Sequence, residues 1–293
     1  MTFVRPAPRA ARRLVSTLGA PDRADLELLV AADPIVNAVV ASRLAGYRSF
    51  DPVRFGGALL GARARAREPL SAAVFNGGNL LPIGGARAEW DALADGVAAE
   101  PQVCTSIVGR ADAVAAMWST LEPAWGPARA IRAEQPLLLI TRDDGLQVRP
   151  EPRLRVMNPA DLARYLPAAA AMFTEELGIS PFAGRSGGTY RRRVESLLAT
   201  GRAFGIVDGD GRMVFKADVG ALTAATCQLQ GVWVRPELRG RGVGTAALAA
   251  VVQHALRLAP SVSLYVNVFN AAARRTYAKL GMREIAKLTT VLF

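Results

Sequence analysis

A glycine-rich turn between an expected strand and an expected helix is the feature that most constrains this chain. Residues 232–245 read VWVRPELRGRGVGT, running from an apolar extended segment through three glycines into an alanine-rich segment. Gly240, Gly242 and Gly244 let the backbone pass close to a ligand and adopt conformations that a side chain would forbid. Because a helix begins there, its free N–H groups and the positive end of its dipole point at whatever occupies the turn. The segment therefore predicts an anion cradle, most naturally for a pyrophosphate.

Two arginines and the lack of a lysine narrow the choice of phosphate ligand. Arg239 and Arg241 add guanidinium donors that suit phosphate oxygens. A Walker loop needs G-x-x-x-x-G-K-[ST], and residues 232–245 contain no lysine. A dinucleotide fingerprint needs G-x-G-x-x-G in a first strand–helix–strand unit, whereas these glycines alternate and follow the fourth strand expected in their half. The glycines alone leave an ordinary flexible turn open as the alternative.

The second half of the chain alternates strand and helix patterns around this turn. The run Asp-Gly-Asp-Gly at 208–211, between two apolar segments, indicates a β-hairpin. In order, we expect a strand from residue 154, helices at 160–177 and 189–200, strands at 202–207, 212–222 and 226–234, a helix at 245–258, a strand at 261–268, a helix at 270–280 and a strand at 283–293. This order predicts a mixed α/β layer.

Two motifs in this half resemble those of a known superfamily. Residues 239–244 fit the pattern [Q/R]-x-x-G-x-[G/A], and residues 270–282 fit N-x-x-[A/S]-x-x-x-Y-x-K-x-G-[F/M]. The two motifs, their order, their separation and the element order resemble the GNAT acetyltransferase superfamily. The resemblance covers nearly half of the chain. It implies a mixed, mostly antiparallel sheet flanked by helices, with an acetyl-CoA loop between the fourth strand and the third helix.

The resemblance also implies roles for individual residues in acetyl-CoA binding. Backbone groups of the strand end, Val232, Trp233 and Val234, would bond the pantetheine arm as an added strand would. The pyrophosphate would be held by the turn itself, namely Arg239, Gly240, Arg241, Gly242, Val243, Gly244 and Thr245. Asn267, Asn270 and Ala273 would lie near the pantetheine. Tyr277 would donate a proton to the departing thiolate, and its alternative is a half-buried aromatic side chain on a helix.

The acceptor side of this superfamily is built by the first two helices and the loop between them. Here that region reads MFTEELGISPF and contains Phe173, Glu175 and Glu176. One carboxylate could attract a cationic amine or relay its proton, and a solvated helix end is the alternative. Several superfamily members carry a glutamate on the fourth strand, but Gln228 and Gln230 occupy that region here. Neither amide can usefully accept a proton, so we assign no base on this strand.

Charge is distributed unevenly along the chain. The formal net charge is +11; residues 1–150 hold 17 arginines against 15 acidic residues, and residues 151–293 hold 19 basic against 10 acidic residues, giving +2 and +9. A basic half implies an anionic partner such as a phosphorylated molecule, a membrane surface or nucleic acid. Nucleic acid is disfavoured because the basic residues are not interleaved with aromatic residues and no DNA- or RNA-reading motif is present. The run Arg191-Arg192-Arg193 indicates a solvated helix face.

The first half predicts a second α/β domain, in which we expect one long helix from Pro21 to Leu44 and a later helix that ends before Pro123. We expect a mobile arm at 1–10, an α/β domain at 11–147 and the GNAT domain at 152–293, with the polar, turn-rich segment Arg142–Pro152 as the boundary. The rhythm of strands and helices in the first domain could be a degenerate copy of the GNAT fold, in which the matching turn would be Ser106–Asp112. That turn has one glycine and an aspartate near the helix start, so we expect no second acetyl-CoA site. The arrangement resembles actinobacterial GNAT proteins with an extra N-terminal domain.

Several residues exclude other chemistry. Cys104 and Cys227 lie 123 positions apart and suggest small buried residues rather than a disulfide framework. His254 is the single histidine and has no companion for a zinc site or a catalytic triad, so we expect it to pack within a helix and expect no metal. No apolar run reaches the roughly 18 residues of a membrane helix, and the basic start lacks the apolar segment of a secretory signal. We expect a soluble, cytoplasmic protein that does not bind membranes.

Together these features predict an acetyl-CoA-dependent N-acetyltransferase. It would transfer an acyl group directly to a primary amine of a small molecule or a protein. A non-catalytic acyl-CoA-binding regulatory module is the alternative, because the fourth strand lacks a carboxylate. The sequence leaves self-association open.

Overall fold

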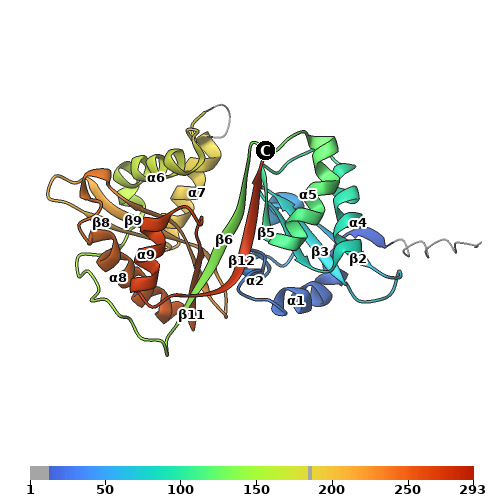
Figure 1. Cartoon of the computed structure of the whole chain (residues 1–293), viewed down its shortest axis with the longest axis horizontal. Helices are drawn as coiled ribbons and strands as arrows, with labels where there is room; N and C mark the ends of the chain where they lie inside the picture. Colours follow the sequence, from blue (N-terminus) through green and yellow to red (C-terminus); the bar gives the residue numbers. More distant parts are fainter. Residues whose placement is uncertain (1–12, 184–186) are drawn as a thin grey trace, which may run out of the picture. The chain divides into compact units, whose positions relative to one another are not determined.

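The computed structural model describes residues 13–183 and 187–293 (Figure 1). The expected arm at 1–10 lies outside these residues. The chain divides into two compact units: unit 1 runs to Gln135 and also holds Lys287–Phe293, and unit 2 is Pro136–Ala286. The expected boundary segment, Arg142–Pro152, therefore falls inside unit 2. The chain crosses between the units earlier, within one strand, and crosses back within the last strand.

Unit 1 is a sheet with helices on both faces. Its elements are β1 (Leu14–Thr17), a short 3-10 helix (Ala20–Asp22), α1 (Arg23–Ala31), α2 (Ala38–Gly46), α3 (Pro52–Phe55), β2 (Gly57–Arg63), β3 (Ala72–Gly77), β4 (Leu80–Gly84), α4 (Arg87–Ala98), β5 (Ser106–Arg110), α5 (Ala111–Trp125) and the start of β6 (Ala130–Thr141). Strands β1 to β4 pair antiparallel, β4 and β5 pair parallel, and β5 pairs antiparallel with the last residues of the chain. Helices α1 to α3 pack on one face of the sheet, and α4 and α5 pack on the other.

Two helix bounds in unit 1 differ from the sequence patterns, and a proline is involved in each. The expected continuous helix from Pro21 to Leu44 is wrong, because the chain leaves the helix after Ala31 and re-enters it at Ala38. Pro34 lacks a backbone N–H and disfavours helical geometry at the residue before it. The expected end of α5 before Pro123 is also wrong. There the proline lies in the last turn, and the helix continues past it at the cost of one backbone hydrogen bond, because proline has no N–H to donate.

Unit 2 follows the element order that the sequence predicts. Its elements are the end of β6, β7 (Arg155–Val156), a 3-10 helix (Pro159–Asp161), α6 (Leu162–Leu177), α7 (Gly187–Ala199), β8 (Ala203–Val207), β9 (Met213–Leu222), β10 (Cys227–Val234), a 3-10 helix (Pro236–Leu238), α8 (Val243–Leu258), β11 (Ser261–Tyr265), α9 (Ala271–Lys279) and β12 (Arg283–Leu292), which ends in unit 1. Strands β7 to β10 pair antiparallel, β10 pairs parallel with β11, and β11 pairs antiparallel with the end of β6. The mixed α/β class with a mostly antiparallel sheet is confirmed.

The two faces of the unit 2 sheet carry different helices. On one face, α6 and α7 enclose an apolar cluster with Tyr165, Val194 and Trp233. On the other face, α8 packs through Leu248, Val251 and Val252 into a larger core. The sheet thus separates a layer of α6 and α7 from the helix that follows the glycine-rich turn.

The two units share one topology. In each, a four-stranded antiparallel meander ends in a strand, a turn and a helix that lead to a parallel neighbouring strand. Because β4, α4 and β5 correspond to β10, α8 and β11, the turn equivalent to the glycine-rich one is at 84–86. The expected equivalence with Ser106–Asp112 is wrong: those residues belong to β5 and the start of α5, one strand later. Gly109 lies in β5, whereas the equivalent turn follows β4.

Candidate functional site

Strands β10 and β11 pair along only a short stretch. Their parallel ladder contains Cys227↔Val262 and Gln228↔Ser263. Toward its end β10 stays paired with β9, but the register is irregular between Gln230 and Trp233, and Gly231 within this bulge has φ +59°. Beyond Gln228, the edge of β10 that faced β11 therefore has no ladder partner within the described residues. An extended ligand could add to that edge as a strand does.

The turn from β10 into α8 is open and lacks a side-chain cap. Helix α8 starts at Val243 after Gly242, which has a left-handed backbone (φ +81°) and caps the helix without a side-chain hydrogen bond. Gly240 is also left-handed (φ +75°), and a Cβ on either glycine would meet nothing within 4 Å. A Cβ on Gly244 would instead lie 2.8 Å from Val234 Cγ2. Two glycines thus shape an open turn, and the third lets the helix approach β10. The first N–H groups of α8 face this turn.

Arg239 is fastened to α6 and β10. Its Nη2 donates to Glu175 Oε2 at 2.7 Å, and its Nε donates to the Val234 carbonyl oxygen at 2.9 Å. Trp233 Nε1 donates to the other carboxylate oxygen of Glu175 at 3.1 Å. Both charged side chains of the ion pair are almost half exposed, so the pair adds little stability by itself. It ties the end of α6 to the entry of the turn, while Arg241 is exposed.

Tyr277 lies on α9 and is 6% exposed. Burial first, and then the negative charge of Glu176, raise the pKa of its hydroxyl to about 12. The hydroxyl therefore stays protonated at neutral pH and can act as a donor. Glu176, at the end of α6, acts electrostatically on this hydroxyl, so the expected acid and one expected acceptor-side carboxylate belong to the same part of unit 2.

The second motif forms the start of α9. The Asn270 side chain caps the helix, its Oδ1 accepting a hydrogen bond from the Ala273 N–H at 3.1 Å. Asn267 is half-buried just after β11, at the side where β10 and β11 diverge. Phe173, on α6, packs its ring edge-on against Tyr190 of α7, with ring centroids 5.2 Å apart. The asparagine at 270 thus has a structural role of its own, because it caps the helix that carries Tyr277.

A buried polar cluster beneath β10 was not predicted. Lys216 on β9 is fully buried, and its Nζ donates to Asp218 Oδ2 at 2.7 Å. Asp218 Oδ1 accepts the Tyr165 hydroxyl at 2.5 Å, and burial followed by the Asp218 charge raises the pKa of Tyr165 well above its usual value. A Cβ on Gly231 would lie 2.8 Å from both the Lys216 and the Asp218 side chains. The signal for this cluster was a pair of opposite charges two positions apart, on one face of an apolar strand.

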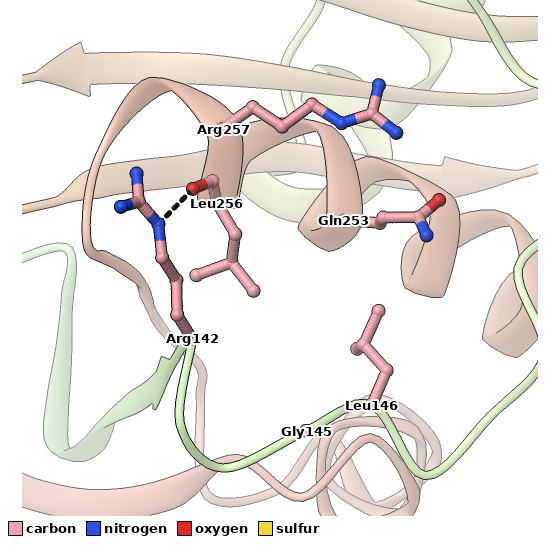
Figure 2. Close-up of a pocket in the computed structure, with 6 residues that line it drawn as sticks. All are labelled: Arg142, Gly145, Leu146, Gln253, Leu256 and Arg257. Atoms are coloured by element: carbon pink, nitrogen blue, oxygen red, sulfur yellow. Dashed lines mark hydrogen bonds between the residues drawn. The ribbon is translucent and has the colours of Figure 1, made fainter.

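A separate hollow of about 650 Å³ opens beside α8 (Figure 2). It is lined by Arg142, Gly145, Leu146, Gln253, Leu256 and Arg257. The Arg142 Nε donates to the Leu256 carbonyl oxygen at 2.7 Å, which joins the loop after β6 to the last turns of the helix. The glycine-rich turn is at the opposite end of α8. None of the predicted site residues lines this hollow, so it is distinct from the turn.

The histidine and cysteines have structural surroundings. The His254 ring packs edge-on against Phe204 at 5.2 Å, and burial, followed by the charge of Arg257, lowers its pKa. Cys104 and Cys227 are free and buried, and burial raises the pKa of each thiol to about 11. No group of three His, Cys, Asp or Glu side chains in the described ranges is arranged to hold a metal ion. Within the same ranges, every helix is too short or too polar to cross a membrane.

Comparison with protein families assigns the second half of the chain. Residues 195–282, which contain β8 to β11, the glycine-rich turn and α9, match the model of the acetyltransferase (GNAT) family. Unit 2 contains a GNAT domain. Residues 57–165 match a model described as a domain of unknown function (DUF4081). A search of curated proteins found no match.

Solved structures share the fold over nearly the whole chain. An acetyltransferase of the GNAT family from Colwellia psychrerythraea is 13% identical, with a TM-score of 0.59 over 96% of this chain and 99% of that chain. A Drosophila protein is 13% identical, with a TM-score of 0.66 over 96% and 99%. A tandem GNAT protein from the clavulanic acid biosynthesis pathway is 15% identical, with a TM-score of 0.56 over 95% and 97%. These likenesses show the fold alone: the GNAT domain is preceded by a GNAT-like unit, as the sequence predicts.

Proposed function

We propose that the GNAT domain of this chain is an acetyl-CoA-dependent N-acetyltransferase that transfers the acetyl group directly to a primary amine. The β10–α8 turn carries this proposal. It offers backbone N–H groups at a helix start without a side-chain cap, open space at Gly240 and Gly242, and an edge of β10 that has no ladder partner among residues 13–183 and 187–293. That combination suits a ligand with a pyrophosphate joined to an extended amide-containing arm.

Each part of the site would contact a different part of acetyl-CoA, which supplies an activated thioester. The backbone of Val232, Trp233 and Val234 would bind the pantetheine arm, and residues 239–245 would surround the pyrophosphate. Asn267 would border the arm where the strands diverge. Asn270 and Ala273 would act indirectly, because the hydrogen bond between them holds the start of the helix that presents Tyr277.

Glu176 and Tyr277 would move the protons of the reaction. As the amine nitrogen bonds to the acyl carbon and the carbon–sulfur bond breaks, the nitrogen loses a proton and the sulfur gains one. Glu176 would accept the first proton, and Tyr277 would donate the second. Protonation of Glu176 removes a charge that raises the pKa of Tyr277, so the hydroxyl becomes a better donor when the thiolate forms. The proton on Glu176 then returns to the tyrosine oxygen.

Calorimetry with acetyl-CoA tests the proposed cofactor site. The chain should bind one acetyl-CoA, and Gly242→Asp should abolish binding, because the carboxylate repels the pyrophosphate and fills the turn. Gly211→Asp is the matched control, since Gly211 has nearly the same backbone (φ +78°) and equally open surroundings in the β8–β9 hairpin. Equal loss of binding in both variants, or no binding by the unmodified chain, would refute the proposal.

A thiol-release assay over a panel of amines tests the chemistry. Release of CoA that depends on an amine supports the transferase. Binding without release on any amine favours the second candidate, a non-catalytic acyl-CoA-binding regulatory module. That candidate rests on Gln228 and Gln230, which place no carboxylate on β10.

A further inference from the structure

Three consecutive arginines on α7 make three different contacts. Arg191 Nε donates to Glu195 on the same helix at 2.8 Å. Arg192 Nη2 donates to the Thr189 hydroxyl, also on α7, at 3.1 Å. Arg193 leaves the helix: its Nη2 donates to Gln230 Oε1 on β10 at 3.0 Å. All three side chains are exposed, as the sequence predicts for a solvated helix face, and the third also reaches the sheet.

The Gln230 side chain, which Arg193 contacts, is itself held in position by its neighbours on the sheet. Gln230 is opposite Asp218 across the β9–β10 ladder and directly precedes the bulge at Gly231. A Cβ on Gly220 would lie 2.5 Å from Gln230 Oε1, so the carboxamide needs the space that this glycine leaves. The carboxamide in turn fixes one end of the guanidinium group. The guanidinium is thereby held beside the middle of β10, at the bulge that precedes Val232–Val234, the segment proposed to bind the pantetheine arm.

The charge of Arg193 is not balanced by a neighbouring carboxylate. Its partner Gln230 is neutral, and no carboxylate in the described residues lies within ion-pair distance of it. Asp218, the nearest acid along the ladder, is already occupied by the Lys216 ammonium and the Tyr165 hydroxyl. A guanidinium has five N–H donors in a planar fork, and Gln230 uses one of them. The others can bind a carboxylate through two parallel hydrogen bonds.

We propose that Arg193 binds a carboxylate of the acceptor, so the acceptor is a small amine that also carries a carboxylate, as an amino acid does. This inference rests on the proposed function, since it places the acceptor beside the β10 bulge, next to the segment that would hold the pantetheine arm. It separates two acceptor classes that the sequence leaves open. The side-chain amine of a lysine within a protein carries no carboxylate of its own, whereas a free amino acid presents both groups.

Matched acceptor pairs test the inference. The probes are amino acids and the corresponding amino acid amides, which keep the amine and replace the carboxylate by a neutral group. The unmodified chain should favour the amino acid in kcat/KM. Arg193→Met should lower kcat/KM for the amino acid by on the order of 10- to 100-fold, the effect of losing a charged hydrogen-bond partner, and leave the amide almost unchanged. Arg193→Lys should retain part of the preference, because a lysine keeps the charge without the planar fork.

Two further measurements keep the test decisive. Arg191→Met, which removes an arginine whose hydrogen bond in the described part of the chain goes to its own helix, should leave the preference for the amino acid intact. Titration of the amino acid into the CoA-bound protein should show the same loss of affinity in Arg193→Met, without any turnover. Equal use of amino acid and amide by the unmodified chain, or turnover only of amines without a carboxylate, overturns the inference. If acetyl-CoA binds normally in that case, the proposed function stands; if acetyl-CoA does not bind the unmodified chain, both fall.

Discussion

The β4–α4 turn of unit 1 and the β10–α8 turn of unit 2 occupy the same place in one topology and are built in opposite ways. A Cβ on Gly85 would lie 2.6 Å from Ala72 Cβ, and Trp90 Nε1 donates to the Gly84 carbonyl oxygen at 2.8 Å. Glu89, which is buried, accepts the Ala86 N–H at 3.2 Å at the start of α4. Unit 1 thus fills its turn with its own side chains and provides its own carboxylate where unit 2 leaves room for an anion.

The layer between the sheet and α1 to α3 in unit 1 also differs from the layer between the sheet, α6 and α7 in unit 2: the first is filled by apolar rings, and the second contains charges. In unit 1, Phe50, Phe55 and Phe75 pack ring to ring between the sheet and α1 to α3. In unit 2, the corresponding layer contains the Lys216–Asp218 pair beside the β10 bulge. The comparison teaches that one fold can serve as a filled scaffold or as an open site, depending on a few residues at one strand end.

The largest expected effect concerns the buried charges of unit 2. Lys216→Met leaves Asp218 buried without its cation and should lower the free energy of unfolding by about 3 to 5 kcal/mol. The double variant Lys216→Met/Asp218→Asn should recover much of that loss, because no unpaired charge remains. Leu59→Met, an apolar exchange in the filled layer of unit 1, should cost less than about 1.5 kcal/mol. Urea unfolding measures all three, and equal losses for Lys216→Met and Leu59→Met would contradict the contrast between the layers.

A second prediction compares buried aromatic residues on equivalent helices. Tyr277→Phe should lower kcat by about 100-fold or more, the usual contribution of a positioned acid, with little change in acetyl-CoA affinity. Trp118 on α5, which stacks on Phe293 at 5.6 Å, is the control. Trp118→Phe should reduce thermal stability and leave kcat unchanged. Unchanged turnover in Tyr277→Phe would remove this residue from the mechanism.

A third prediction uses one glycine from each turn. In Gly85→Ala, the new Cβ is placed on a left-handed backbone (φ +87°) and too close to Ala72 Cβ, so the free energy of unfolding should fall by about 2 to 4 kcal/mol. In Gly240→Ala, the new Cβ adds backbone strain without a close contact, so the free energy of unfolding should fall by about 1 kcal/mol. Acetyl-CoA affinity should fall in Gly240→Ala and persist in Gly85→Ala. Thermal unfolding and calorimetry distinguish the two, and loss of affinity in Gly85→Ala alone would reverse the assignment of the turns.

The smallest expected effect is a shift of a tyrosine titration. The charge of Glu176 raises the pKa of Tyr277, so Glu176→Gln should lower that pKa from about 12 toward the usual value of a tyrosine, while burial keeps it raised. Ultraviolet absorbance of tyrosinate during an alkaline titration reports the shift. The difference should vanish when Glu176→Gln is introduced into Tyr277→Phe. A shift that persists there would assign it to another tyrosine.

The sequence predicted features that depend on neighbouring residues and missed those that depend on distant ones. The glycine-rich turn and the hairpin at 208–211 could be predicted because glycine spacing and turn residues act locally. The break at Pro34 was missed because apolar periodicity continued across it. The Lys216–Asp218 pair and the contact of Arg193 with Gln230 depend on which strand and helix lie opposite, which one sequence does not reveal. The equivalent turn of unit 1 was missed because Gly84 and Gly85 serve close packing, without the alternating spacing of the other turn.

The two crossings of the chain limit how this protein can be divided. Leu137–Thr141 at the end of β6 pair with β11, so they complete the sheet of unit 2 although the rest of the first half precedes them. Leu288–Leu292 pair with β5 in unit 1. If the chain were cut in the polar loop after Thr141, the first product would lack β12 and the second would lack β6. Each product would then expose an unpaired sheet edge that favours aggregation. Each unit contains a strand from the other half of the sequence, so neither half of the chain alone contains a complete sheet.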